Sequence, residues 1–373
     1  MVEATADIVV IGAGVMGSAA GRELARRGAK VLVLERSIPG AEASSAAAGI
    51  LGAQAEADSP GPLFDLFRRS RELYGPFACE LEGQTGIRTG YAKCGVLLLA
   101  FEEKEQEYLI RKASWQKEKG LAVDLLRRSD LPALGVPLSE KAVGGLLLPD
   151  DGQVEPPLLA KALARGAELA GAKFLRASIE KILVENGKAA GVQTSEGKVS
   201  CGKILVAAGA WTALVAGTGL PPSAVRPVRG QVVQFEGKAG LFKQILIRHG
   251  HGYLVPRPDG RVVAGSTMEE AGFEKAVTVA GLHKILTLAE TLVPALGAAR
   301  FQDAWSNFRP TTPDHLPLLG EGPVPGVFFA SGHHRNGILL IPATAELAAD
   351  LLTGKPPALD PAPFSPRRLA DGK

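Results

Sequence analysis

The chain opens with an apolar run, a glycine-rich turn and a second apolar run. Residues 7–11 are mostly apolar and predict a buried strand, and the turn Gly12-Ala13-Gly14-Val15-Met16-Gly17 follows directly. Apolar positions recur at helical spacing over residues 15–27, with Gly28 as a stop, and residues 30–35 predict a second strand. This order of elements is typical of a dinucleotide-binding unit.

The turn has glycine where a bound pyrophosphate needs it. Gly12 allows a tight exit from the strand, Gly14 lets a phosphate approach the backbone, and Gly17 lets the helix pack closely on the strands. Glu35 ends the second strand at the spacing expected for a carboxylate that accepts hydrogen bonds from a ribose. We therefore predict a dinucleotide site; the alternative is a glycine-rich turn without a ligand.

The pattern beyond this unit mixes helices with strands. It predicts helices at residues 62–82, 102–118, 156–170, 277–292 and 338–352, and strands at residues 95–100, 143–148 and 327–331. Residues 179–208 are predicted to form a small meander around an Asn186-Gly187 turn. Short alternating runs between residues 231 and 267 predict an antiparallel sheet, different in kind from the parallel opening unit. The proline-rich segment after Lys355 is expected to pack poorly.

Three further segments offer bare backbone to a large ligand. Residues 44–53 carry mostly small side chains, as a backbone that lies flat against a planar ligand requires; the alternative is an ordinary helix start. The strand at residues 203–206 runs into Ala207-Ala208-Gly209, where backbone can approach a cofactor. A glycine-bracketed polar loop at residues 332–337 precedes the last helix and suits the electron-rich part of a cofactor.

Composition describes a globular protein of two domains. The 373 residues are too many for one ordinary core, and 46% hydrophobic with 22% charged residues is typical of globular chains. Lys+Arg 42 against Asp+Glu 39 gives a net charge of +3, which argues against a nucleic-acid surface. Three scattered cysteines argue against a disulfide framework or a zinc site and favour a reducing compartment. The sequence shows neither a leader pattern nor a membrane-length apolar run, so we expect a cytoplasmic protein that spans no membrane.

Candidate binding residues gather late in the chain. Arg309 lies between aromatic residues and precedes a proline, and its planar fork would suit a substrate carboxylate. The alternative is an ordinary ion pair with Asp303 or Asp314. Tyr253 and Arg335 are further candidates on glycine-flanked segments, although a strand tyrosine such as Tyr253 more often belongs to the core.

No acid/base, nucleophile or metal motif is apparent in the sequence. The adjacent His333 and His334 lack further ligands at metal-binding spacing, so we expect no metal site. A bound cofactor must therefore carry the chemistry.

Together these motifs resemble the glycine oxidases of the FAD-dependent D-amino-acid oxidase superfamily. The resemblance runs essentially end to end, and its most specific part is Gly332-His333-His334-Arg335-Asn336-Gly337-Ile338-Leu339-Leu340. Its other carriers lie at residues 11–19, 45–53, 154–156, 253–257, 309–310 and 313–314.

The resemblance implies a fold that combines α/β and α+β parts in two domains. A Rossmann-like FAD-binding domain of the D-amino-acid oxidase type would comprise residues 1–85, 150–222 and 305–373. A substrate-binding domain, with a large, mostly antiparallel β-sheet flanked by helices, would comprise residues 86–149 and 223–304.

The resemblance also implies residue roles. Arg309 and Tyr253 would hold the substrate carboxylate, Arg335 would lie near flavin and substrate, and Gly52 and Ala53 would line the small-substrate pocket. The positions implied for FAD, with Gly209 added from the strand end, are Gly12, Gly14, Val15, Gly17, Glu35, Arg36, Ser44, Ser45, Ala48, Gly49, Leu51, Ile179, Gly209, His333, His334, Arg335, Asn336, Gly337, Ile338 and Leu339.

Two departures from the family pattern concern the pocket. Ser306 and Asn307 stand where the family commonly has alanine and glycine, and Thr311 stands where it often has glycine. These changes alter volume and polarity beside the carboxylate anchor, so the preferred amino acid stays open. Because no cysteine follows Cys201, the covalent flavin link of monomeric sarcosine oxidase is excluded and non-covalent FAD is expected.

The function implied is oxidation of glycine, sarcosine or small D-amino acids to the oxo acid, ammonia and hydrogen peroxide. Hydride would pass from Cα to flavin N5 without a protein acid or base, in a homotetramer, with O2 as acceptor and thiamine biosynthesis as the pathway. Three alternatives stay open: a dehydrogenase that passes electrons to a quinone or partner protein, an idle dinucleotide-binding module, and an NAD-dependent dehydrogenase.

Overall fold

A computed structural model describes residues 4–370. A six-stranded sheet forms the half of the molecule that the sequence predicts to bind the cofactor, which we call the cofactor half. The strand order is β19 (Leu318–Glu321), β20 (Val327–Ser331), β13 (Lys203–Val206), β2 (Ile8–Ile11), β3 (Val31–Glu35) and β9 (Lys173–Arg176). All pairs are parallel except β19 with β20. The predicted strand, turn, helix and strand at the start of the chain are confirmed as β2, α1 (Val15–Arg26) and β3.

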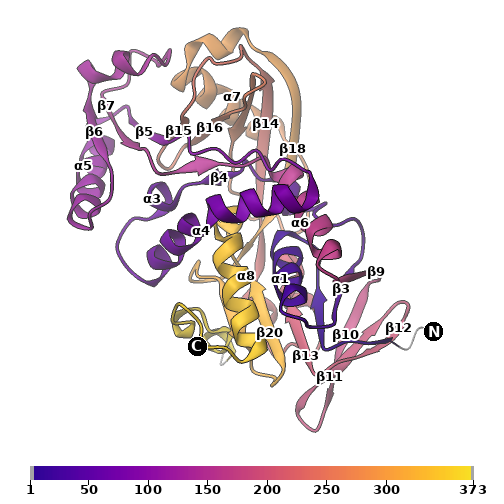
Figure 1. Ribbon diagram of the computed structural model, residues 1–373. Coiled ribbons are helices and arrows are strands. Elements are labelled where there is room, and N and C mark those ends of the chain that lie inside the picture. Colours follow the sequence, from indigo (N-terminus) through magenta and orange to yellow (C-terminus); the bar gives the residue numbers. More distant parts are fainter. Residues whose placement is uncertain (1–3, 371–373) are drawn as a thin grey trace.

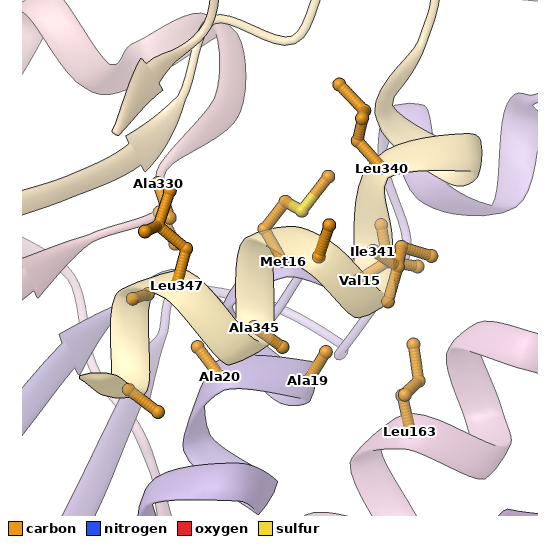
Figure 2. Close-up of a cluster of buried hydrophobic side chains, with 14 of the residues drawn as sticks. Val15, Met16, Ala19, Ala20, Leu163, Ala330, Leu340, Ile341, Ala345 and Leu347 are labelled. Carbon is orange, nitrogen blue, oxygen red and sulfur yellow. The ribbon is translucent and has the colours of Figure 1, made fainter. Parts of the chain in front are cut away.

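Helices cover this sheet. The indigo α1 lies beside the yellow α8 (Gly337–Thr353) in Figure 1, with α6 (Pro156–Leu169) and α4 (Pro62–Thr85) packed against them. Figure 2 shows the reason for this close packing: Ala19 and Ala20 of α1 face Ala345 of α8, and these small side chains let the two helices approach. Leu163 and Leu347 fill the space around them, and burial of a leucine contributes roughly 1.5–3 kcal/mol.

A four-stranded sheet lies at one end of the cofactor half. Its order is β1 (Ala4–Thr5), β12 (Gly197–Ser200), β11 (Lys188–Thr194) and β10 (Ile179–Glu185). The meander is confirmed for β10 to β12, but its extension to residue 208 is wrong, because β13 leaves it for the six-stranded sheet. There β13 lies between β2 and β20, which buries Ile204, Leu205 and Val206 completely.

The other half of the molecule is built on an eight-stranded sheet. Its order is β18 (Arg300–Thr311), β14 (Arg226–Glu236), β17 (Arg261–Gly265), β16 (Gly252–Pro256), β15 (Ile245–Arg248), β5 (Val96–Ala100), β7 (Gly144–Leu148) and β6 (Asp124–Arg127). Every neighbouring pair is antiparallel except β15 with β5. The helices α5 (Glu103–Glu118) and α7 (Val279–Leu292) pack against it (Figure 1). The predicted large, mostly antiparallel sheet is confirmed.

Short elements join the two halves. They are α2 (Ala43–Ala46), β4 (Ile50–Leu51), α3 (Ala53–Glu56) and β8 (Gly152–Gln153), and β4 pairs with β8. The expected domain boundary at residue 305 falls inside β18, whose whole length pairs with β14. The boundaries themselves stay predictions.

The segment after residue 355 packs better than its proline content indicated. Two short 3-10 helices (Ala362–Phe364 and Pro366–Leu369) follow α8, and Phe364 is 1% exposed. Arg368 Nε binds Asp314 Oδ2 at 2.7 Å. The expectation of poor packing is wrong for the described part of this segment, because an aromatic anchor and an ion pair fix it.

Candidate active site

One large cavity connects the two halves of the molecule. It has a volume of about 650 Å³, within the range of ligand sites, and its wall takes in the glycine turn, the small-residue segment, β16, β18 and the loop before α8. The wall includes both the glycine turn, from the start of the chain, and Arg309, from near its end. A single long ligand can therefore contact both.

The glycine turn is held tightly against neighbouring backbone. Gly12 has φ +98°, and a Cβ atom there would lie 2.7 Å from the carbonyl oxygen of Ala207. A Cβ atom at Gly17 would overlap the carbonyl oxygen of Gly12. Glycine at both positions is thus a steric requirement of the turn.

Glu35 and Ser44 are bonded to this turn. Glu35 Oε2 accepts a hydrogen bond from Ala13 N at 2.9 Å, and Ser44 Oγ accepts one from Val15 N at 3.0 Å. Both residues also line the cavity, so each lies where a ligand bound to the turn would be in reach. The ribose contact of Glu35 stays a prediction.

Arg257 fastens the small-residue segment to the second half of the molecule. Its Nη2 donates to Ala48 O at 2.7 Å, and its Nη1 donates to Gln153 Oε1 at 2.6 Å and to Val154 O at 2.9 Å. Arg257 is 5% exposed, and burial lowers its pKa. Gly49, next to Ala48, has φ +84°, and a Cβ atom there would overlap Val154 O.

The loop before α8 brings two uncharged histidines to the cavity. His333 Nε2 lies 3.1 Å from Thr344 Oγ1, and burial lowers the pKa of His333 to about 3. His334 Nδ1 lies 2.8 Å from Thr311 Oγ1, and burial followed by the charge of Arg309 lowers its pKa to about 3. Both rings are therefore neutral near pH 7.

Arg309 lines the cavity from β18 without a carboxylate partner. Its Nη1 donates to Thr267 O at 3.1 Å and its Nη2 to Ser266 Oγ at 2.7 Å. Desolvation lowers its pKa, and within residues 4–370 no Asp or Glu oxygen lies within ion-pair distance of it. The alternative pairing is wrong, since Asp314 binds Arg368 and Asp303 Oδ1 accepts from Ala304 N.

Tyr253 joins Arg309 through the same serine. It lies on β16, opposite Gly265 of β17, and also lines the cavity. Burial raises the pKa of Tyr253, and the charge of Arg309 and a hydrogen bond with the Ser266 side chain oppose the rise. Arg309, Ser266 and Tyr253 form one polar group on the cavity wall, as a carboxylate anchor requires.

Arg335, unlike Arg309, has a carboxylate partner in the described part of the chain. Its Nε lies 2.5 Å from Glu56 Oε2, and the Glu56 charge is the main cause that raises the pKa of Arg335. Glu56 ends α3, and both residues line the cavity. The Arg335 side chain is 45% exposed and that of Glu56 is 19% exposed, so the pair lies toward the solvent side of the wall.

Most predicted cofactor positions line the cavity. They are Gly12, Gly14, Val15, Glu35, Arg36, Ser44, Ala48, Gly49, Ile179, Gly209, His333, His334, Arg335, Asn336, Gly337 and Ile338. Gly17, Ser45, Leu51 and Leu339 do not, and pack behind the wall instead. The roles of all these residues toward a ligand stay predictions.

Two predicted pocket positions face elsewhere. Gly52 precedes α3 and Ala53 opens it, and Ala53 is completely buried in the core of the cofactor half. Ala55 and Glu56, further along the same short helix, line the cavity in their place.

Sequence reasoning missed several residues of the site. Glu56, Ser266, Arg257 and Trp211 each contact predicted site residues: Trp211, for example, lies beneath the Arg36 guanidinium, with 4.1 Å from Cζ to the ring centroid. Glu56 could have been found from the sequence, because it is a carboxylate that comes shortly after the small-residue segment. Partners across strands, such as Ser266, carry no local signal.

The three residues of the two departures from the family pattern lie around the anchor. Asn307 lines the cavity and donates from Nδ2 to Glu42 Oε2 at 3.2 Å, whereas Thr311 is completely buried on His334. Ser306 is 8% exposed and pairs with Gln231 of β14. Asn307 is therefore the departure that changes the cavity wall.

The wall fits FAD. Gly12 and Gly14 present bare backbone to the cavity, and the same cavity joins the glycine turn to the Arg309 anchor. Among residues 4–370 no group of three His, Cys, Asp or Glu side chains could hold a metal ion. None of the helices in the same range is long and apolar enough to cross a membrane.

Comparison with known proteins defines the class. The family model for FAD dependent oxidoreductases matches residues 7–351, and the chain belongs to this family. It is therefore an FAD-dependent oxidoreductase, and the predicted cofactor and end-to-end resemblance are confirmed.

Individual relatives narrow the class. The chain is 38% identical over 362 residues to a glycine oxidase of Geobacillus kaustophilus, which covers 96% of each protein. The crystal structure of glycine oxidase from Geobacillus kaustophilus matches with a TM-score of 0.95 at 37% identity, over 98% of this chain and 99% of that one. The chain is also 36% identical over 374 residues to the bifunctional protein ThiO/ThiG of a Synechocystis species, which is 98% of this chain and 54% of that protein.

Proposed function

We propose that this protein oxidatively deaminates glycine and other small amino acids, such as sarcosine and small D-amino acids. The products would be the oxo acid, hydrogen peroxide and ammonia, or methylamine in place of ammonia when the substrate is sarcosine. The observation that carries the proposal is the Arg309 guanidinium, which lines the cofactor cavity and, within residues 4–370, binds uncharged oxygens alone. Similarity to glycine oxidases over 96% of the chain supports it.

The chain contributes positioning. Arg309 would bind the substrate carboxylate in a bidentate manner, and Tyr253, joined to it through Ser266, would donate to the same carboxylate. This arrangement fixes the substrate Cα, and such orientation is a large part of what a protein adds to a reaction of a bound cofactor. When bound, FAD would supply the two-electron oxidation at Cα, with O2 as the final acceptor.

No protein base is needed if the amine enters unprotonated. Its lone pair then assists the departure of hydride, and the imine hydrolyses in water to the oxo acid and ammonia. The neighbouring histidines are compatible with a neutral amine, because His333 and His334 remain uncharged near pH 7.

A substrate panel tests the proposal. Purified, FAD-loaded protein is offered glycine, sarcosine, D-alanine and D-proline in air. Hydrogen peroxide is measured without a dye, and dye reduction is measured in a second assay that contains an artificial electron acceptor. Peroxide formation without the dye is expected. Turnover that requires the dye would favour a dehydrogenase, and no turnover in either assay would favour an idle binding module.

Pathway, location and assembly belong to the same proposal. The similarity to ThiO/ThiG over 98% of this chain supports a place in thiamine biosynthesis. Non-covalent FAD, a cytoplasmic location and a homotetramer remain predictions from the sequence.

A further inference from the structure

The cavity wall carries two arginines that differ in one respect. Arg309 is bonded to neutral oxygens, whereas Arg335 is bonded to the Glu56 carboxylate at 2.5 Å. Arg309 lies among β14, β16 and β17, and the side chain of Arg335 is 45% exposed. Within residues 4–370, Arg309 therefore faces inward without a carboxylate partner, whereas Arg335 is occupied by Glu56 and lies near solvent.

The charges around the anchor add up to one positive charge. Arg309 and Arg335 are cationic and Glu56 is anionic, and the charges of Arg335, Glu56 and Glu269 act on the pKa of Arg309. Glu269 is paired with Arg229, so that pair adds no net charge. The nearby Asp58 is engaged elsewhere, because it accepts from Tyr108 Oη at 2.6 Å and lies 3.6 Å from Lys112 Nζ. This balance matches a substrate with a single carboxylate.

We propose that Glu56 is a specificity-determining residue. By occupying Arg335, it leaves Arg309 as the carboxylate site, so the cavity accepts amino acids with one carboxylate and rejects those with two. This inference rests on the proposed function and names the substrate class of the same site.

The physical reason is competition for Arg335. A second carboxylate on a substrate held by Arg309 would meet the Glu56 charge, and like charges in a partly desolvated site repel. To reach Arg335 it would have to displace a partner already at hydrogen-bond distance. Once Glu56 is neutral, Arg335 can offer its planar fork to that second carboxylate.

Binding of substrate analogues tests the inference without turnover. FAD-loaded wild-type, Glu56→Gln and Glu56→Gln/Arg335→Gln proteins are titrated with acetate, malonate and succinate, and Kd is read from the flavin absorbance change. Gln is close in shape to Glu and keeps the end of α3. We expect the wild type to bind acetate more tightly than the dicarboxylates. In E56Q the ratio of acetate Kd to dicarboxylate Kd should rise at least tenfold, because the dicarboxylates bind more tightly.

Two variants serve as controls. The double variant E56Q/R335Q should lose the shift, because the gain depends on Arg335. Glu42→Gln should keep the wild-type ratio, since Glu42 lines the same cavity but binds Lys275 and Asn307.

The outcomes separate the two proposals. An unchanged ratio in E56Q, an equal shift in the double variant, or no spectral response to any carboxylate would overturn the role of Glu56. The same titration in Glu56→Ala guards against an effect specific to glutamine. A wild-type enzyme that binds acetate but forms no peroxide from glycine would contradict the proposed function alone.

Discussion

The Arg309 guanidinium lies across Gly230 on the neighbouring strand. A Cβ atom at Gly230 would overlap both terminal nitrogens of Arg309 and lie 2.5 Å from its Cζ. Tyr253 has the same relation to Gly265, where a Cβ atom would lie 2.6 Å from the phenol oxygen. Each proposed carboxylate anchor therefore lies over a glycine on an adjacent strand, and these glycines fix the position of the anchors.

The substitution Gly230→Ala should displace Arg309. The added methyl group would overlap the guanidinium, which donates to Thr267 O and Ser266 Oγ, so the arginine has to leave its present place. We expect KM for glycine to rise at least tenfold, with a smaller change in kcat and in FAD affinity. Steady-state kinetics and FAD titration measure the three quantities.

Gly83→Ala is the matched control. Gly83 is an exposed residue of α4 with no heavy atom within 4 Å of an added Cβ. KM should stay at the wild-type value, and the helix should gain about 0.5–1 kcal/mol of stability. An unchanged KM in G230A would contradict the steric role of Gly230.

Removal of the anchor itself should cost substrate affinity. Arg309→Ala loses two charge-assisted hydrogen bonds to a carboxylate, which together are worth about 3 kcal/mol or more, or over 100-fold in apparent affinity. Arg309→Lys retains the charge without the fork and should fall between R309A and the wild type. Glycine kinetics and acetate titration give the two values.

An exposed arginine provides the comparison. Arg165 on α6 binds Glu168 at 3.1 Å on the surface, so Arg165→Ala should alter neither value. Substrate affinity that is unchanged in R309A would remove Arg309 from the site.

The spacing of apolar residues and glycines predicted those parts of the fold that depend on neighbouring residues in the sequence. The glycine turn, α1 and β3 were predicted from residue spacing, because few sequences allow a tight turn directly from a strand into a helix. The place of β13 between β2 and β20 did not follow, since its three apolar residues after Lys203 suit a meander strand and a buried central strand equally. Pairing between distant strands decided it.

The same limit applies to the site. Arg309 and Tyr253 were visible as polar residues in apolar, glycine-flanked segments, and the structure places both on the cavity wall. The partner of Arg335 was not visible, because Glu56 lies 279 positions away in the sequence. Its contact exists through the packing of α3 against the loop before α8, which no local pattern encodes.

Arg257 should control how firmly the small-residue segment is held. Arg257→Met keeps an apolar side chain of similar length but leaves Ala48 O, Gln153 Oε1 and Val154 O without their donor. Loss of these buried bonds should destabilise the fold by about 3 kcal/mol or more. FAD should also dissociate more readily, because Ala48 lines the cavity. Urea unfolding and flavin fluorescence on dilution measure the two effects.

Arg261 allows a close control for Arg257. Arg257 Nε lies 3.5 Å from Glu155 Oε2, and Arg261 binds the same carboxylate at 3.0 Å. The Arg261 side chain, however, is 32% exposed and lies outside the cavity wall. Arg261→Met should cost about 1 kcal/mol or less. Equal losses of FAD in both variants would mean that Arg257 acts on general stability and not on the segment.

The lowered pKa values of His333 and His334 should make the protein sensitive to mild acid. The pKa of His334 is about 3 in the fold and near 6.5 when exposed, so only the unfolded chain binds a proton as the pH falls below 6.5. A lowered folded pKa stabilises the fold above pH 6.5, and this stability is lost as the pH falls toward 3. His334→Asn removes the effect of one ring while tolerating φ +49° at this position. Between pH 7.5 and pH 5 the variant should lose about 2 kcal/mol less stability than the wild type in urea unfolding. His283→Asn, at an exposed position of α7, should leave the pH dependence as it is, and equal losses in wild type and H334N would show that His334 is protonated within the fold.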